Sequence, residues 1–480
     1  MNTFRLKYRH IWQNAENWLI ILFLATFALN MRKIFLTPYS FLNGTFNEYT
    51  TLSFSWADLL MLAVIIIYTI RWLISQFSDI PLTKAIQYNV IRYKSSVIRF
   101  YYDVSRETII LLVFLVWIGL SVFWSQYKLI ALYRFATFLE ISFFAIIAVK
   151  SLKNQKWLRL AFFALIFNGL FQSILGIAQF VHNKSLEIHW LGESILGANI
   201  DGVAKIIIGG EKHIRAYGTL PHPNILAGFL MIPIFIILAE LLNRLAFAKF
   251  DNIKVSRGTF LDVIPIWVIL ISFTIIFAGF LLTFSRSAFL GLTVGFLLLC
   301  FLHRKKLARQ SRLGLVIIFF SAVLAVGYLT HSNKDTISLF STQSLEERNL
   351  YQNVARETIS VHPLAGVGIG QFVFEEFQKH PDLEGWEYQP VHNVYLLVFS
   401  ELGAIGLALF ILWLLLILEW GSRKECNTKL LLTYNVFCCI VLLYFLIFLF
   451  DHYFWDIKLG LAIFTLPILF LKIGSNKAIP

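Results

Sequence analysis

The pair His392-Asn393 lies where the longest polar stretch of the chain, residues 331–391, meets an apolar segment that begins at residue 393. Histidine has an ordinary pKa of about 6.5, so its neutral imidazole can accept a proton near neutral pH. General-base chemistry is therefore available at this boundary. The amide of Asn393 either orients the imidazole or caps the helix that follows.

Two arginines lie in turns next to apolar segments, where a fixed charge is costly. Arg215 is part of RAYGTLPHPN and Arg286 is part of TFSRSA. A guanidinium offers a planar fork of donors that matches phosphate oxygens, and it keeps its charge at a low-dielectric edge. We therefore predict an anion site formed by Arg215 and Arg286. Arg32 and Lys33, at the end of the first apolar run, fit either such a site or snorkelling and helix capping.

The composition indicates the elements that must position these side chains. Hydrophobic residues make up 58% of the chain, charged residues only 14%, and the mean hydropathy is +0.71. A soluble domain carries about a quarter charged residues, so a soluble protein is excluded. We predict an all-α polytopic membrane protein of about twelve helices, because a spanning helix needs about 17 to 25 apolar residues. The predicted spans are 18–36, 56–75, 108–124, 129–149, 158–181, 223–242, 262–284, 287–302, 313–329, 393–418, 430–450 and 457–473.

The distribution of Lys and Arg predicts the orientation, since cytoplasmic loops retain positive charge. Placing the N-terminus inside puts most of the 41 Lys and Arg residues in cytoplasmic segments, and both termini are then cytoplasmic. The net charge of +13 is mainly a topology signal, so it requires no nucleic-acid partner. We expect one membrane domain over 1–480, with outer segments at 182–222 and 331–391.

The second outer segment is predicted to be partly helical. Apolar residues recur within SLEERNLYQNVARETI, and the helix should end at His362-Pro363. The GxGxG that follows favours a flexible connection over a site of close backbone approach. Arg348 and Arg356 lie eight residues apart near the same helix face. Either arginine contacts a substrate, or both make ordinary ion pairs with neighbouring glutamates.

Other polar residues allow more than one interpretation. His222 precedes a Pro-Asn helix start, so it contacts substrate or caps the helix. Arg134 lies inside the predicted span 129–149, near its outer end, and could reach an anion there. Asp382 and Glu384 form a D-x-E that could bind a hard cation, but two loop carboxylates are usually solvated. We predict no metal and no cofactor.

Four segments together resemble the O-antigen ligase superfamily. They are RAYGTLPHPN at 215–224, TFSRSA at 283–288, SLEERNLYQNVARETISVHPLAGVGIGQF at 344–372 and VHNVYLLVFSELGAIGL at 391–407. The superfamily includes O-antigen ligases, polysaccharide polymerases and bacterial O-oligosaccharyltransferases. The order and spacing of the segments carry the resemblance, and the His-Asn pattern is its most distinctive part.

The resemblance implies a GT-C-like enzyme in the bacterial inner membrane, with its active site on the periplasmic face. It implies inverting transfer of a glycan from undecaprenyl diphosphate, without metal, to an acceptor hydroxyl. The acceptor is lipid A-core in a lipopolysaccharide maker, and otherwise a growing glycan or a protein. In this reading His392 is the base, and Arg215 and Arg286 hold the diphosphate.

A polysaccharide or lipid transporter is the alternative from another functional class. A transporter is expected to show related halves and ionisable residues near the bilayer midplane. Here the notable polar residues gather at the predicted outer face instead. An ATP-driven pump is disfavoured because the chain has no GxxxxGK[ST] sequence.

Overall fold

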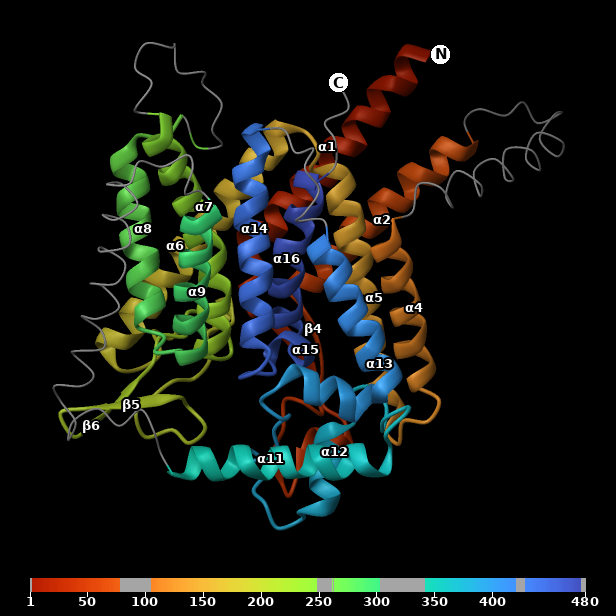
Figure 1. The fold of residues 1–480 in the computed structure, drawn as a ribbon, viewed down its shortest axis with the longest axis vertical. Helices are drawn as coiled ribbons and strands as arrows, with labels where there is room; N and C mark the ends of the chain where they lie inside the picture. Colours follow the sequence, from red (N-terminus) through yellow and green to blue (C-terminus); the bar gives the residue numbers. More distant parts are fainter. Residues whose placement is uncertain are drawn as a thin grey trace, which may run out of the picture.

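The computed structural model describes residues 2–77, 105–247, 261, 263–302, 342–419 and 428–475. These residues form a helical bundle whose long helices run side by side (Figure 1). The helices are α1 (Asn2–Thr26), α2 (Trp56–Phe77), α4 (Arg106–Ser121), α5 (Lys128–Ser151), α6 (Gln155–His182), α7 (Pro223–Phe247), α8 (Ile266–Leu281), α9 (Arg286–Leu302), α11 (Thr342–Val361), α12 (Phe372–Lys379), α13 (Val394–Glu419), α14 (Thr428–Ile447), α15 (Tyr453–Asp456) and α16 (Lys458–Ser475).

The helices agree with a polytopic membrane protein. Within the described residues, five helices are long and apolar enough to cross a bilayer: α2, α5, α6, α7 and α13. Shorter apolar helices include α8, α9 and the residues 435–447 of α14. The predicted spans from 56–75 to 457–473 coincide to within a few residues with helices of the structure, which for 108–124 and 457–473 are α4 and α16. The predicted span 313–329 lies outside the described residues.

α7 is the most deeply buried of the five long apolar helices. In its most apolar stretch of 18 residues, 94% of the residues are buried, whereas only 28% are buried in the corresponding stretch of α2. α7 contacts α6, α8, α14, α9 and α16. Because α7 is enclosed by other helices, the residues at its N-terminal end are held by protein on several sides.

The prediction of a first span over 18–36 is wrong at its C-terminal end. α1 ends at Thr26, and Arg32–Phe35 form strand β1, which pairs antiparallel with β4 (Leu52–Ser55). Apolar content alone does not separate a helix from a short strand, and Arg32 forms an ion pair with Glu48 in this region. Arg32 and Lys33 therefore lie in a strand and not at the end of the first helix.

One end of the bundle carries most of the remaining elements, and we call it the site end (Figure 1). It includes β1 and β4, the pair β2 (Phe41–Leu42) and β3 (Thr45–Phe46), and the hairpin β5 (Lys205–Ile208) and β6 (Glu211–Ile214). α11 lies across the bundle here, roughly perpendicular to the long helices. Its end at Val361 confirms the predicted stop at His362-Pro363.

The GxGxG turn is a site of close backbone packing, and the flexible connection favoured above is wrong. The backbone N–H of Gly368 donates to the carbonyl of Glu401 in α13 at 2.8 Å. At Gly368, φ is +105°, and a Cβ would lie 1.9 Å from Oγ of Ser125. Only glycine fits this conformation and this spacing. The turn therefore ties the segment after α11 to α4 and α13.

Candidate functional site

His392 lies at the site end, immediately before α13. The side chain of Asn393 accepts the backbone N–H of Leu396 at 3.0 Å, which caps the helix. The imidazole of His392 is 21% exposed, and its centre lies 6.0 Å from the ring of Tyr351 in α11. The interpretation of Asn393 as a cap therefore has direct structural support, and His392 retains access to solvent.

Asp451 and His452, in the turn between α14 and α15, lie beside His392. Nδ1 of His392 is 3.8 Å from Oδ1 of Asp451, which is beyond hydrogen-bond distance. The ring centres of His392 and His452 are 4.7 Å apart. Neither residue was singled out in the sequence. The sequence did contain a signal for them, because Asp451-His452 is a polar pair next to an apolar segment, as His392-Asn393 is.

His452 is fixed by a carboxylate. Its Nδ1 lies 2.9 Å and 3.0 Å from the two carboxylate oxygens of Asp456, and its backbone N–H donates to Oδ1 of Asp451 at 3.0 Å. The side chain of His452 is only 5% exposed. An imidazole held in this way has a defined ring orientation, with Nε2 as its remaining nitrogen.

Arg215 is connected to His392 through two intervening side chains. Its Nη2 donates to Oδ1 of Asn224 at 2.8 Å, and Nδ2 of Asn224 donates to Oδ2 of Asp451 at 2.7 Å. Nε of Arg215 donates to the carbonyl of Thr283, three residues before Arg286, at 2.5 Å. The segments around residues 215, 286 and 392, which are far apart in the sequence, thus meet at one place.

The arginines of the site lie close enough to influence one another. Burial lowers the pKa of Arg215 to about 10; the charge of Arg286 lowers it as well, whereas Tyr217 and Asp451 oppose the shift. Arg348, on α11, lowers the pKa of His392. Arg348 therefore adds positive charge near His392, and Arg286 adds it near Arg215; guanidinium groups favour an anionic ligand.

The two imidazoles of the site differ in basicity. Burial lowers the pKa of His392, and the charges of His452 and Arg348 add to this effect, although the Asp451 carboxylate opposes it. Burial alone would also lower the pKa of His452, but Asp456 and Asp451 outweigh it and raise that pKa. His392 is therefore the imidazole that is neutral over the wider pH range.

His222 immediately precedes α7 and takes the capping role. Its Nδ1 accepts the backbone N–H of Asn224 at 3.1 Å. Burial and the charge of Arg215 lower the pKa of His222 to about 3, so this imidazole is neutral and can accept that hydrogen bond. His222 thereby holds the helix start that carries Asn224.

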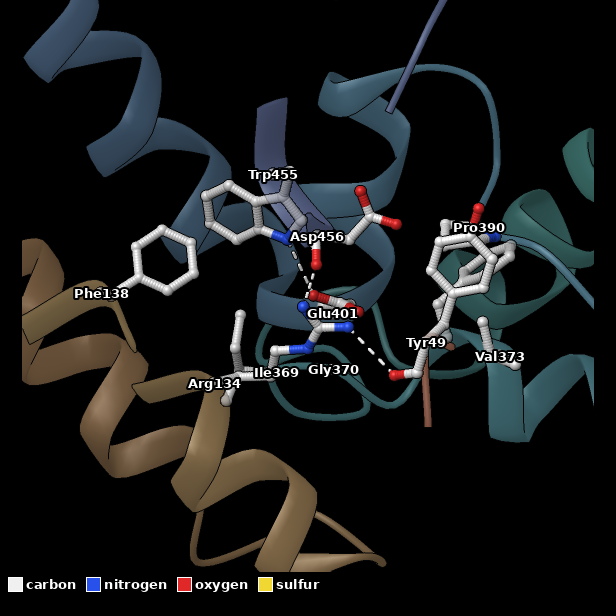
Figure 2. A pocket seen from close by; sticks show the side chains of 11 residues that line it. Tyr49, Arg134, Phe138, Ile369, Gly370, Val373, Pro390, Glu401, Trp455 and Asp456 are labelled. Atoms are coloured by element: carbon white, nitrogen blue, oxygen red, sulfur yellow. Dashed lines mark hydrogen bonds between the residues drawn. The ribbon is translucent and has the colours of Figure 1, made fainter. Parts of the chain in front are cut away.

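The remaining predicted residues are distributed around the site. Arg134, on α5, donates from Nη1 to the carbonyl of Asp456 and from Nη2 to the carbonyl of Tyr49 at 3.0 Å (Figure 2). Lys33 is exposed in β1, and Arg356 is exposed on α11, whereas Arg348 on the same helix is only partly exposed. Of the two α11 arginines, Arg348 is the one whose charge lowers the pKa of His392, after the larger effect of burial.

Within the described residues, one group has the donor types and spacing for a metal ion. His392, Asp451 and His452 each offer a ligand atom within 4.8 Å of the others. Both oxygens of Asp451 already accept hydrogen bonds, and Arg348 lies near both imidazoles. Asp382 and Glu384 are exposed. This exposure agrees with the interpretation of Asp382 and Glu384 as solvated loop carboxylates.

Residues 271–411 match the O-antigen ligase family, which confirms the resemblance noted in the sequence. The matching region includes Arg286, Arg348 and His392, whereas Arg215 and Asp451 lie outside it. No curated protein matches the chain.

Proposed function

Because residues 271–411 match the O-antigen ligase family, we propose that this protein is a membrane glycosyltransferase that uses a glycan carried on undecaprenyl diphosphate. The observation that carries the proposal is the hydrogen-bonded path from Arg215 through Asn224 to Asp451, next to His392. It joins a group suited to bind diphosphate to a group suited to accept a proton.

The arginines and Asp451 have different roles in the proposed reaction. Arg215 and Arg286, with Arg348, stabilise the charge that develops on the leaving diphosphate. The negative charge of Asp451, 3.8 Å from Nδ1 of His392, favours the tautomer with a proton on Nδ1 and a free lone pair on Nε2.

The reaction is a single inverting displacement. The acceptor oxygen forms a bond to the anomeric carbon while the bond from that carbon to the diphosphate oxygen breaks, and the electron pair leaves with the diphosphate. The acceptor proton passes to Nε2 of His392. The products are the glycosylated acceptor and undecaprenyl diphosphate, and no metal is required.

The proposal includes the location. The site end faces the periplasm, both termini are cytoplasmic, and the protein lies in the bacterial inner membrane as one GT-C-like domain of about twelve helices. The segments 182–222 and 331–391 are then its outer elaborations. The acceptor is lipid A-core in a lipopolysaccharide maker, and a growing glycan or a protein in the polymerase and O-oligosaccharyltransferase variants of the same chemistry.

A transfer assay tests the proposal with His392→Ala. The donor lipid and acceptor-bearing membranes come from a strain that lacks this chain, and the assay contains a chelator. Loss of a general base lowers the rate by about 10² to 10⁴, while donor binding should persist because the arginines remain. Asn393→Ala is the matched control, because it removes a cap worth about 1 kcal/mol and no proton acceptor.

The outcomes separate the parts of the proposal. Near-normal transfer by His392→Ala would remove His392 as the base. Loss of wild-type transfer in chelator would favour a metal held by His392, Asp451 and His452. Absence of transfer by the wild-type protein both with and without the chelator would contradict the proposed function itself.

A further inference from the structure

His392, Asp451 and His452 together offer more than a proton acceptor, and we call these three residues the His-Asp-His group. Each side chain has one ligand atom within 4.8 Å of the other two. Two imidazole nitrogens and one carboxylate oxygen are a common donor set for Zn²⁺. Mg²⁺ and Ca²⁺ prefer oxygen ligands, whereas imidazole suits Zn²⁺. The donor types therefore indicate Zn²⁺ if an ion binds here.

The spacing of the group is close to that around a bound ion. Nδ1 of His392 lies 3.8 Å from Oδ1 of Asp451. In a tetrahedral Zn²⁺ site with bonds of about 2.0 to 2.1 Å, neighbouring ligand atoms lie about 3.3 Å apart. The limit of 4.8 Å for the group exceeds that value by about 1.5 Å. A shift of this size is within reach of side-chain rotation, and the partly exposed His392 leaves a way in for the ion.

His452 has the environment of a metal-binding histidine. Its Nδ1 contacts both carboxylate oxygens of Asp456, at 2.9 Å and 3.0 Å, which leaves Nε2 as the nitrogen for a ligand. A histidine that binds a metal almost always donates its other ring N–H to a carboxylate, a carbonyl or water. The Asp456 carboxylate fixes the ring of His452 in the same way before any ion binds.

The other two members of the group also have lone pairs to offer. Oδ1 of Asp451 accepts the backbone N–H of His452, and Oδ2 accepts Nδ2 of Asn224. A carboxylate has about four lone-pair sites, so both oxygens can bind a further group. Nδ1 of His392 is buried and has no hydrogen-bond partner among the described residues. A buried polar atom without a partner is costly, and an ion would supply the missing partner.

Positive charge near the group does not exclude a cation. Arg348 influences both imidazoles, but burial and the nearby carboxylates have larger effects on their pKa values. The Asp456 carboxylate lies 2.9 Å from Nδ1 of His452. The Asp451 carboxylate lies 3.8 Å from Nδ1 of His392. These two carboxylates supply the negative charge that favours a Zn²⁺ ion.

An ion at this place would prevent His392 from acting as the base. A neutral imidazole has one lone pair and one N–H. If the lone pair binds an ion, the other nitrogen carries the proton, whichever of the two nitrogens is the ligand. His392 could then no longer accept the proton of the acceptor hydroxyl. The ion would therefore be an inhibitor and not a cofactor.

We propose that the His-Asp-His group binds one Zn²⁺ ion per chain, and that this ion inhibits transfer by occupying the lone pair of His392. The inhibition rests on the proposed function, whereas the ion site does not. The metal-free reaction described above is then that of the active form, and the chelator in the transfer assay keeps the protein in this form.

A binding measurement that needs no substrate tests the ion site. The full chain, purified without a histidine tag and freed of metal, is titrated with Zn²⁺ by calorimetry and with Co²⁺, whose visible absorption reports tetrahedral coordination. We expect one ion per chain. Asp456→Asn keeps all three ligands but removes the partner behind one of them, so it should lower the affinity about 10- to 100-fold. His452→Ala removes a ligand and should lower it further.

The controls separate the site from nonspecific binding and from misfolding. His362→Ala is the matched control, because His362 is exposed at the end of α11 and lies outside the group. It should bind the ion as the wild type does. His452→Gln, which keeps a polar side chain, is measured beside His452→Ala in case the truncation lowers the amount of folded protein.

The transfer assay tests the inhibition. Saturating Zn²⁺ should lower the wild-type rate about 10²-fold or more, toward that of His392→Ala, because the base is blocked. Chelator should restore the rate. Mg²⁺ at the same concentration should have no effect, since it prefers oxygen ligands. For Asp456→Asn, measured against its own zinc-free rate, half-inhibition should need about 10 to 100 times more Zn²⁺.

The outcomes distinguish the ion site from the proposed function. No bound ion, or binding that neither His452 variant weakens, would overturn the site. Bound Zn²⁺ without effect on transfer would overturn the inhibition, and faster transfer with Zn²⁺ would indicate a cofactor instead. If the wild-type protein transfers nothing with or without chelator, the proposed function and the inhibition fail together, while the titrations still decide on the ion site.

Discussion

Asn224 donates its side-chain amide to the carboxylate of Asp451 at 2.7 Å, although the two residues are 227 positions apart. Asn224 belongs to the first turn of α7, and Asp451 follows α14. The same amide group accepts from Arg215 through its oxygen. One side chain thus sets the relative position of the proposed diphosphate contact and the carboxylate next to the proposed base.

The first prediction is energetic coupling along this path. Asn224→Ala should lower transfer about tenfold to a hundredfold, because it removes both hydrogen bonds; bonds to charged groups each contribute about 1.5 to 3 kcal/mol. Combining it with Asp451→Asn should cost much less than the sum of the single effects, since both changes break the same connection. Initial rates of the four proteins provide the measurement. Strictly additive losses would mean that the path does not act as a unit.

The second prediction separates the two arginines. Arg286→Ala and Arg215→Ala should each lower the rate by about 10² to 10³, the usual loss for a charge-stabilising donor. Lysine should restore part of the activity at position 286 and less at 215, because Arg215 uses two separate nitrogens, for Thr283 and Asn224. The amount of folded protein in the membrane is the control. Wild-type transfer by Arg286→Ala would exclude that residue from the site.

The third prediction concerns pH. The neutral form of His392 is the active base, so transfer should be lost as pH falls through its pKa. That pKa is lowered by burial and by nearby positive charge, so the loss should occur below the ordinary value of about 6.5. Asp451 opposes the shift. Asp451→Asn should therefore move the acidic limb to still lower pH while reducing the maximal rate. A pH–rate profile with an acidic midpoint above 6.5 would contradict this assignment.

The fourth prediction is the topology. Cysteines introduced singly at Ile195 and Leu364, which are 70% and 67% exposed at the site end, should react with an impermeant reagent from outside. A cysteine at Lys153, which is exposed between α5 and α6, should react only after permeabilisation. The background protein lacks the four native cysteines. Reaction at position 364 from the cytoplasm alone would place the site end on the wrong side for a periplasmic reaction.

The helices were predictable because the bilayer leaves the backbone few alternatives. A segment such as 223–242 must satisfy its own hydrogen bonds within lipid, so apolar length and helix coincide. The segment after α1 is different, because its residues 32–35 pair with β4 at the site end and do not have to satisfy their backbone hydrogen bonds within a helix. Hydropathy alone predicted that the first helix continues past Arg32. The pairing of residues 32–35 with β4, some twenty positions later in the sequence, cannot be read from local hydropathy.

The site was predictable only in part. His392, Arg215 and Arg286 were recognised because each combines a chemically capable side chain with a membrane boundary. Asn224 and Asp451 were missed because their hydrogen bond joins residues 227 positions apart. His452 was missed because it lies in a short turn between two apolar segments, and only those segments were interpreted. The role of His222 remained open until its Nδ1 was seen to accept the N–H of Asn224.

α8 has a consequence for the lipid around it. Its 16 residues give about 24 Å of helix at 1.5 Å per residue, compared with about 30 Å for an average hydrocarbon core. Trp267 and Ile271 are exposed along it, 62% and 52%. A short apolar helix favours local thinning of the bilayer, at a cost of fractions of a kcal/mol per Å. Thinning of this kind would lower the membrane surface beside Arg286. Under the proposed function, a polyprenyl carrier entering there would meet the arginines without its head group having to rise out of the leaflet.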